Sequence, residues 1–128
     1  MQKIIVAIDG FASTGKSSLA KRLAETLNYT YIDSGAMYRA VTYFAIQKGH
    51  QGHIDKEKLI AQLDQIEIYF KYSKSGHQTF LNGLNISKEI RLSEVTEQVS
   101  KVSKILEVRS LLVTQQQKLG AKKAIIMD

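Results

Sequence analysis

The sequence predicts an α/β fold in which helices flank a parallel sheet. Short, unbroken apolar runs occur near both ends of the chain, and such runs are typical of strands that are buried on both faces. Segments with helical periodicity lie between these runs. The first run is followed directly by a glycine-containing turn and a helix. Many parallel α/β sheets begin with this order of elements.

Composition places the chain among folded proteins of one domain. It has 128 residues, of which 44% are hydrophobic and 23% charged, so we expect a single domain over residues 1–128. It has no cysteine, which excludes disulfides and thiolate metal sites. No apolar run could span a bilayer and the first residues carry no signal-peptide pattern, so we expect a cytoplasmic protein without a membrane partner.

The formal net charge is +6, and this basic balance has two possible interpretations. A basic balance favours an anionic partner such as a nucleotide. Lys and Arg are spread along the chain rather than clustered, which fits an ordinary solvated surface equally well. We find no RNA- or DNA-binding motif and expect no nucleic-acid partner.

The first half of the chain is predicted to alternate strands and helices. Leu19, Leu23 and Leu27 fall four residues apart, as on one face of a helix. Gly49 is a plausible helix stop, and Asp55 can cap a short third helix. The predicted elements are strands at 3–8 and 29–32 and helices at 16–27 and 36–48.

The pattern changes near residue 66. Ile66, Ile68, Phe70 and Tyr72 alternate with more polar residues, which indicates half-exposed strands. A turn at 73–76 and a return strand at 79–81 would complete a small antiparallel insert. Beyond it we expect a helix from 93 to about 119, broken near Ser103 and ended by Gly120, and then a buried strand at 124–127.

The stretch GFASTGKSS has the spacing of a phosphate-binding loop. Gly10 and Gly15 let backbone N–H groups point inward, and the start of the following helix adds its positive dipole end. Lys16 can reach the β and γ phosphates, and Ser17 or Ser18 can offer a hydroxyl to Mg²⁺. The alternative is an ordinary strand-to-helix turn. The predicted ATP-binding residues are Gly10, Phe11, Ala12, Ser13, Thr14, Gly15, Lys16, Ser17 and Ser18.

A second motif, YIDSGAMYR, suggests a second anion site. Asp33 and Ser34 follow a predicted strand at its carboxyl end, where ligands bind in open α/β sheets. Ser34 can cap the next helix, Gly35 allows close approach, and Arg39 lies one turn further on. Two anion sites suggest a phosphate donor and an acceptor. Plain helix capping by Ser34 and a solvated charge at Arg39 explain the spacing equally well.

Together these motifs resemble the cytidylate kinase family of bacterial nucleoside monophosphate kinases. The segments FLNGLNISKEIR, VSKVSKILEVR and AIIMD are similar to later parts of the same family, in the same order. The resemblance implies a P-loop NTPase-like parallel sheet with an antiparallel monophosphate-binding insert at approximately 62–92. It also implies transfer of the γ-phosphate of ATP to CMP or dCMP, with Mg²⁺ as cofactor.

The resemblance also assigns roles to residues. Lys16 and Arg39 would be catalytic, with Arg39 clamping the α-phosphate of CMP, and Ser17 and Asp128 would serve the metal. Spacing alone puts Ser100 and Arg109 on different faces of a straight helix, so they can converge only if that helix is bent or broken. The implied CMP-binding residues are Asp33, Ser34, Gly35, Arg39, Ser100 and Arg109.

Two features depart from the family. Phe11 stands where the family usually has proline, at a loop tip. The family also continues past Asp128 with further core strands and an arginine-bearing lid. We therefore expect an incomplete core, negligible activity from residues 1–128 alone and association through exposed apolar surface, whereas a full enzyme would be a monomer.

Two other functions stay open. One is a kinase for another small acceptor, such as AMP or shikimate; the insert speaks against it, because those relatives typically have a smaller or helical acceptor region. The other is a nucleotide-binding module without activity.

Overall fold

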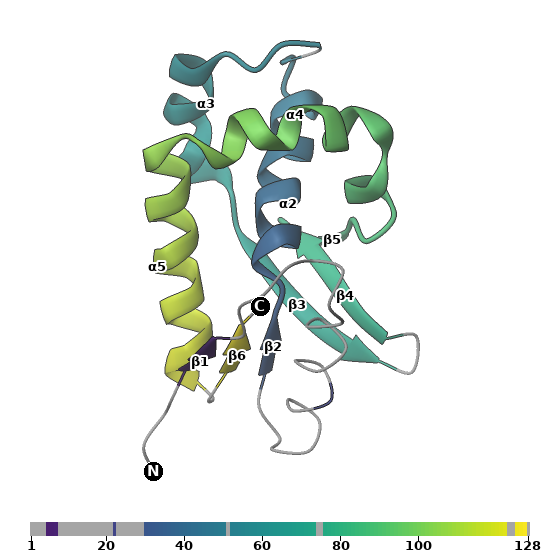
Figure 1. The fold of residues 1–128 in the computed structure, drawn as a ribbon, viewed down its shortest axis with the longest axis vertical. Coiled ribbons are helices and arrows are strands. Elements are labelled where there is room, and N and C mark those ends of the chain that lie inside the picture. The colour runs from purple at the N-terminus through teal and green to yellow at the C-terminus, as the bar shows by residue number, and fades with distance from the viewer. Residues whose placement is uncertain are drawn as a thin grey trace. The chain divides into compact units, whose positions relative to one another are not determined.

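The computed structural model describes residues 5–7, 22, 30–50, 52–73, 76–122 and 125–127. The chain divides into two compact units, one of Met1–Gly35 with Gln116–Asp128 and one of Ala36–Gln115. Each unit is described by itself (Figure 1). Of the predicted helix at 16–27 only Arg22 is described, and it is helical.

The first unit contains a three-stranded parallel sheet. Its strands are β1 (Ile5–Ala7), β2 (Thr30–Ile32) and β6 (Ile125–Met127), in the order β1-β6-β2. Ile126 pairs with Val6 on one side and with Tyr31 on the other. Strand β6 is therefore the central strand of the three, and the first strand, β1, lies at one end of this strand order.

Helix α2 (Ser34–Gln47) buries an apolar face and ends as the sequence predicts. Its buried residues include Met37, Val41 and Phe44. Gly49 has a φ of 98°, which an L-residue rarely adopts, and its N–H donates to the Ile46 carbonyl at 3.3 Å. The His50 N–H reaches back to the Ala45 carbonyl at 3.1 Å, which completes a Schellman motif.

Asp55 caps α3 (Lys56–Gln62), as predicted: its side chain accepts a hydrogen bond from the Lys58 N–H at 3.2 Å. The His50 side chain is only 2% exposed and braces the same region. Its Nδ1 accepts from the Asp55 N–H at 3.1 Å, so Nε2 carries the proton and donates to Gln62 Oε1 at 3.0 Å. The short helix η2 (Leu63–Gln65) follows.

The predicted antiparallel sheet is present in the second unit. It consists of β3 (Ile68–Ser73), β4 (Gly76–Leu81) and β5 (Leu84–Asn85). The return strand begins at Gly76 rather than at 79, because pairing with β3 runs to the end of the hairpin. Ile68 and Leu81 are buried on one face. On the opposite face Tyr69 and Phe80 stack with ring centroids 5.1 Å apart.

Strand β5 was missed by the sequence analysis, although its signal is visible. Asn82 and Gly83 form the connection from β4 and have φ values of 50° and 88°. An Asn-Gly pair with two positive φ angles is the favoured two-residue hairpin turn. The Asn82 side chain secures this turn, since its Oδ1 accepts from the Glu67 N–H and its Nδ2 donates to the Gln65 carbonyl, both at 2.8 Å.

The rest of the second unit is helical. Helix η3 (Glu89–Arg91) leads into α4 (Ser93–Ser103) and then α5 (Leu106–Lys122), so the predicted break near Ser103 is confirmed. The predicted stop at Gly120 is wrong: a glycine ends a helix by adopting a left-handed conformation, and Gly120 stays helical.

Long-range hydrogen bonds connect α5 to the start of the antiparallel sheet. The Gln115 amide accepts from the Ile68 N–H at 3.0 Å and donates to the Ile66 carbonyl at 2.7 Å. The Gln115 side chain therefore satisfies two backbone groups, the N–H of Ile68 at the start of β3 and the carbonyl of Ile66 just before it.

Candidate functional site

The predicted donor side of the site cannot be compared with the structure. Every residue of the phosphate-binding loop, including Lys16 and Ser17, lies outside the described residues, and so does Asp128. Among the residues that are described, no cluster of three or more His, Cys, Asp or Glu could hold a metal ion. The Mg²⁺ ligands Ser17 and Asp128 therefore remain predictions.

The second motif occupies the turn from β2 into α2. Strand β2 ends at Ile32 and α2 begins at Ser34, so Asp33 is the single residue between them. A Cβ added to Gly35 would lie 3.3 Å from Asp33 Oδ1, which is tighter than most contacts of its kind. The Asp33 carboxylate thus lies close to Gly35, and a side chain at position 35 would crowd it.

Arg39 is half-buried on α2 and its guanidinium is held in place. Nη1 donates to the Ile90 carbonyl at 3.1 Å and to Thr96 Oγ1 at 2.9 Å. A guanidinium has five N–H donors, and no hydrogen bond joins Nε or Nη2 to the residues that the structure describes. Both acceptors belong to residues more than fifty positions away in the sequence, so Arg39 connects α2 to η3 and α4 within the second unit.

Ser100 and Arg109 are on two helices, not on one. Ser100 is on α4 and Arg109 on α5, and both residues are exposed. The first helix ends where the Lys104 N–H bonds to the Val102 carbonyl, and α4 and α5 then run in different directions (Figure 1). Ser100 and Arg109 could converge only if a bend or break separates them, and the end of α4 is such a break.

Sequence reasoning missed the residues that position Arg39. Thr96 is on the first turns of α4, and Ile90 contributes only its carbonyl oxygen from η3. Neither carries a local signal, since the contacts exist only once η3 and α4 have folded against α2. A threonine on an otherwise ordinary helix gives no indication in the sequence of a partner 57 residues away.

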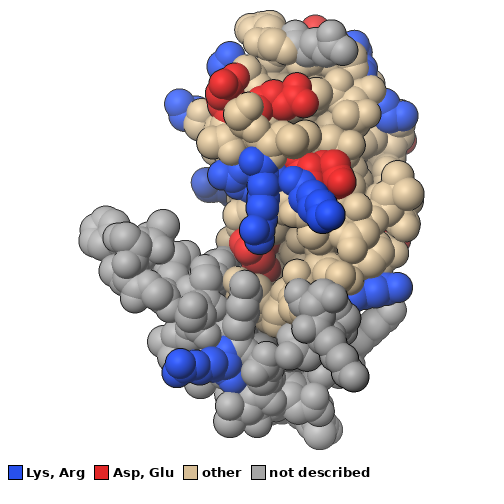
Figure 2. All heavy atoms as spheres, turned by 90° about the vertical axis from the view of Figure 1, so that its right-hand side faces the viewer, with Lys and Arg blue, Asp and Glu red and all other residues tan. Residues whose placement is uncertain are grey.

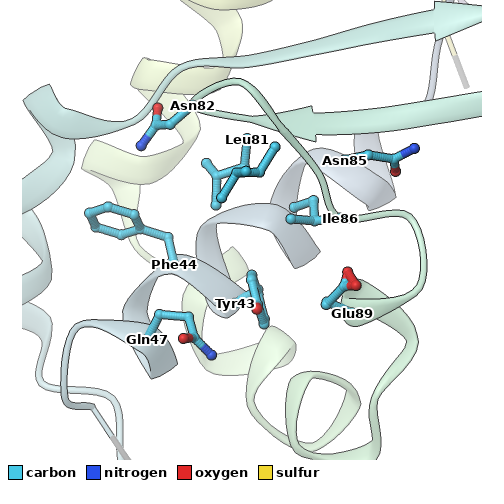
Figure 3. Close-up of a pocket in the computed structure, with 9 residues that line it drawn as sticks. Tyr43, Phe44, Gln47, Leu81, Asn82, Asn85, Ile86 and Glu89 are labelled. Carbon is cyan, nitrogen blue, oxygen red and sulfur yellow. The ribbon is translucent and has the colours of Figure 1, made fainter.

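A pocket of about 420 Å³ lies within the second unit (Figure 3). Phe44, Leu81 and Ile86 give it an apolar floor and are at most 7% exposed. Polar side chains from α2, from the β4–β5 segment and from η3 border this floor, and the Asn85 amide points away from it (Figure 3). Tyr43, Gln47, Asn82, Asn85 and Glu89 are these residues.

The charged surface is mixed. Figure 2 shows Lys and Arg side chains interspersed with Asp and Glu over the described part of one face, without a continuous basic stripe there. No helix in the described ranges combines the length and apolarity needed to cross a membrane.

Comparison with known proteins identifies close relatives. Residues 6–128 match the family model described as cytidylate kinase. A cytidylate kinase of Flavobacterium johnsoniae is 53% identical over 132 residues, which cover 100% of this chain and 57% of that protein. A cytidylate kinase of Flavobacterium psychrophilum is 52% identical over 132 residues, which cover 100% of this chain and 58% of that protein. One from Lysinibacillus sphaericus is 51% identical over 128 residues, 99% of this chain and 56% of the relative. The chain thus spans less than two thirds of the length of the curated relatives that it matches.

Proposed function

The chain belongs to the cytidylate kinase family. From this membership we propose that the protein containing the chain transfers the γ-phosphate of ATP to CMP or dCMP, giving CDP or dCDP. The observation that carries the proposal is the match of residues 6–128 to that family. The motifs of the phosphate-binding loop and of the β2–α2 turn supply the donor and the acceptor sides that this reaction needs.

Arg39 is the proposed acceptor clamp. Its Nη1 contacts fix the plane of the guanidinium before any ligand binds, and the unused Nε and Nη2 edge offers the paired donors that match two phosphate oxygens. Because the side chain is already ordered, little rotamer entropy is lost when the phosphate arrives.

The remaining roles rest on the sequence. Lys16 and the backbone of residues 10–18 are proposed to hold the ATP phosphates. Mg²⁺, oriented by Ser17 and Asp128, would supply charge neutralisation at the transferred phosphoryl group. Ser100 and Arg109 are proposed to hydrogen-bond the edge of cytosine, with the break between α4 and α5 allowing them to converge. Asp33, Ser34 and Gly35 complete the CMP side. The insert at approximately 62–92 is proposed as the monophosphate-binding segment.

Arg39→Ala tests this arrangement. The variant should weaken CMP binding at least about tenfold and leave binding of the nucleoside cytidine nearly unchanged, because the ligand loses a contact to its phosphate and none to its base. Circular dichroism verifies that loss of the bonds to Ile90 and Thr96 leaves the fold intact. Calorimetric titration of both ligands measures the difference. Lys56→Ala, at an exposed position on α3, is the matched control and should change neither affinity. Equal losses for nucleotide and nucleoside would refute the clamp.

A coupled assay of ADP release tests the reaction itself. Release that requires both ATP and CMP, and that AMP or shikimate does not support, is the expected outcome for the kinase. Lys16→Ala should abolish it. Binding of CMP with no release in any parent protein that contains this chain would instead favour a nucleotide-binding module.

A further inference from the structure

We propose that Thr96 is a positioning residue for the acceptor phosphate, because its hydroxyl holds the Arg39 guanidinium in the orientation that receives the phosphate of CMP. This role rests on the proposed function, in which Arg39 is the acceptor clamp. Thr96 lies outside both phosphate-site motifs of the sequence, and it acts on the ligand only through Arg39.

The Thr96 hydroxyl is used differently from those of the other helical threonines that the structure describes. Thr42 on α2 and Thr114 on α5 each donate to the carbonyl four residues back, at 2.8 Å and 3.0 Å. Threonines inside helices commonly make this local bond. No such bond joins Thr96 to the Leu92 carbonyl in the described part of the chain, and Thr96 Oγ1 accepts from Arg39 Nη1 at 2.9 Å. The hydroxyl therefore serves a side chain 57 residues away rather than its own helix.

Thr96 completes the hydrogen bonding of one guanidinium nitrogen. Nη1 of Arg39 carries two N–H groups, and it has two acceptors, the Ile90 carbonyl at 3.1 Å and the Thr96 hydroxyl. Because a guanidinium is planar, two acceptors on one nitrogen fix the direction in which the Nε and Nη2 donors point. Without the hydroxyl only the bond to Ile90 would remain, and the side chain could turn about it.

Helix α4 makes Thr96 a fixed anchor. Val95 and Val102 on this helix are fully buried, so packing sets the position of the helix. Thr96 itself is exposed, so water can replace its hydroxyl and no buried group is left unsatisfied when the hydroxyl is removed. Loss of the hydroxyl should therefore free the Arg39 side chain while the fold stays intact.

The proposed base contact offers a way to separate positioning from a general effect on α4. Ser100 lies four residues after Thr96, so the two residues share one face of this helix. A displaced α4 would disturb the base contact of Ser100 together with Arg39. Loss of the hydroxyl alone would disturb only the phosphate clamp. Binding of cytidine, which has a base but no phosphate, distinguishes the two cases.

Thr96→Val is the test, because it removes the hydroxyl and keeps the branched shape. In the protein that contains this chain, the affinity for CMP should fall and its KM should rise about three- to tenfold, since Arg39 loses its orientation. The KM for ATP and the affinity for cytidine should stay unchanged. Steady-state kinetics and calorimetric titration measure these values.

Two further variants control for the substitution itself. Thr96→Ser keeps the hydroxyl and should retain CMP affinity to within about twofold. Thr114→Val is the same change at another exposed helical threonine, whose hydroxyl bonds only to the Ser110 carbonyl, and it should leave CMP affinity unchanged. Equal losses of CMP and cytidine binding in Thr96→Val, or a serine variant as weak as the valine variant, would overturn the positioning role.

Combining Thr96→Val with Arg39→Ala tests whether Thr96 acts through Arg39. In the Arg39→Ala background, Thr96→Val should weaken CMP binding no further. A further loss as large as in the single variant would show that the hydroxyl serves the ligand without Arg39, which overturns the proposal.

The clamp and the role of Thr96 fail in different ways. If Arg39→Ala leaves CMP binding unchanged, the clamp is refuted and the role of Thr96 falls with it. If Arg39→Ala weakens CMP binding and Thr96→Val does not, only the role of Thr96 is refuted. Circular dichroism verifies that each variant folds.

Discussion

The two sheets of the protein are assembled over very different distances along the chain. In the antiparallel sheet Leu81 pairs with Leu84 across a two-residue turn. In the parallel sheet Ile5 pairs with Ile125, and Thr30 pairs with the same residue from the other side. Local turn chemistry can set the first sheet, whereas the second requires the far end of the chain to return between two early strands.

This difference shows where each sheet is vulnerable. A local hairpin forms from neighbouring residues and is weakened mainly at its turns and cross-strand pairs. A parallel sheet depends on its central strand, because that strand carries ladder hydrogen bonds to both neighbours. Four substitutions test the contrast, in order of expected effect.

Ile126→Pro should cause the largest loss of stability. Ile126 lies in the middle of β6 between Val6 and Tyr31, and proline removes a backbone donor from the ladder. The free energy of unfolding should fall by about 3 kcal/mol, close to the upper cost of leaving one buried group unsatisfied. Urea unfolding of the chain measures it. Ile126→Val keeps the donor, so the ladder stays intact and the loss should be well below that of the proline variant. Equal losses in the two variants would contradict the central place of β6.

Gln115→Ala tests whether the antiparallel sheet is purely local. The substitution removes both hydrogen bonds to the backbone around β3, at Ile68 N–H and the Ile66 carbonyl. We expect a loss of roughly 2 kcal/mol in unfolding free energy. Gln115→Glu can still accept from the Ile68 N–H but cannot donate to the Ile66 carbonyl, so its loss should be smaller than that of the alanine variant if the retained Ile68 bond contributes. A neutral alanine variant would show that the sheet needs no support from α5.

Gly83→Ala tests the turn that begins β5. Gly83 has a φ of 88°, and a Cβ there would meet no atom within 4 Å, so any cost comes from backbone strain and not from a clash. The loss should be roughly 1–2 kcal/mol. Gly83→Asn should recover part of it, because asparagine tolerates the left-handed region better than alanine does. Thermal unfolding of the two variants gives the comparison, and an alanine variant as stable as the asparagine one would argue against strain.

Phe80→Leu should have the smallest effect. The substitution removes the stack with Tyr69 and the contact of the Lys71 ammonium, whose Nζ lies 5.0 Å from the Phe80 ring centroid. Aromatic pairs contribute about 0.5–1.5 kcal/mol beyond burial. A double-mutant cycle with Tyr69→Leu isolates the pair term. A coupling energy of zero would mean that the two rings are neighbours without stabilising the sheet.

The sequence predicted the helices best where their ends carry chemistry of their own. Asp55 was assigned as a cap, and its side chain does accept the Lys58 N–H. Gly49 was assigned as a stop, and it takes the positive φ of a Schellman motif. Gly120 failed as a stop because the same residue type is also tolerated inside a helix, and nothing local distinguishes the two cases.

Of the proposed acceptor site, the sequence identified the motif residues but not their supports. Arg39 was found by its place one turn into a helix that follows a strand. Its anchors, Thr96 and the Ile90 carbonyl, have no sequence signature, because a backbone oxygen or a helical threonine becomes a partner only through packing.

By itself, then, the sequence determined the α/β class, the motifs that place the chain in its family, and several features set by contacts of a few residues: alternation in β3, the Asp55 cap and the Gly49 stop. Tertiary structure alone decided that β6 lies between β1 and β2 and that Arg39 is held by Ile90 and Thr96. The physical reason is that helix caps, turns and side-chain periodicity depend on neighbours along the chain. Strand order and buried polar partners depend instead on which distant surfaces pack together, and many arrangements share the same local pattern.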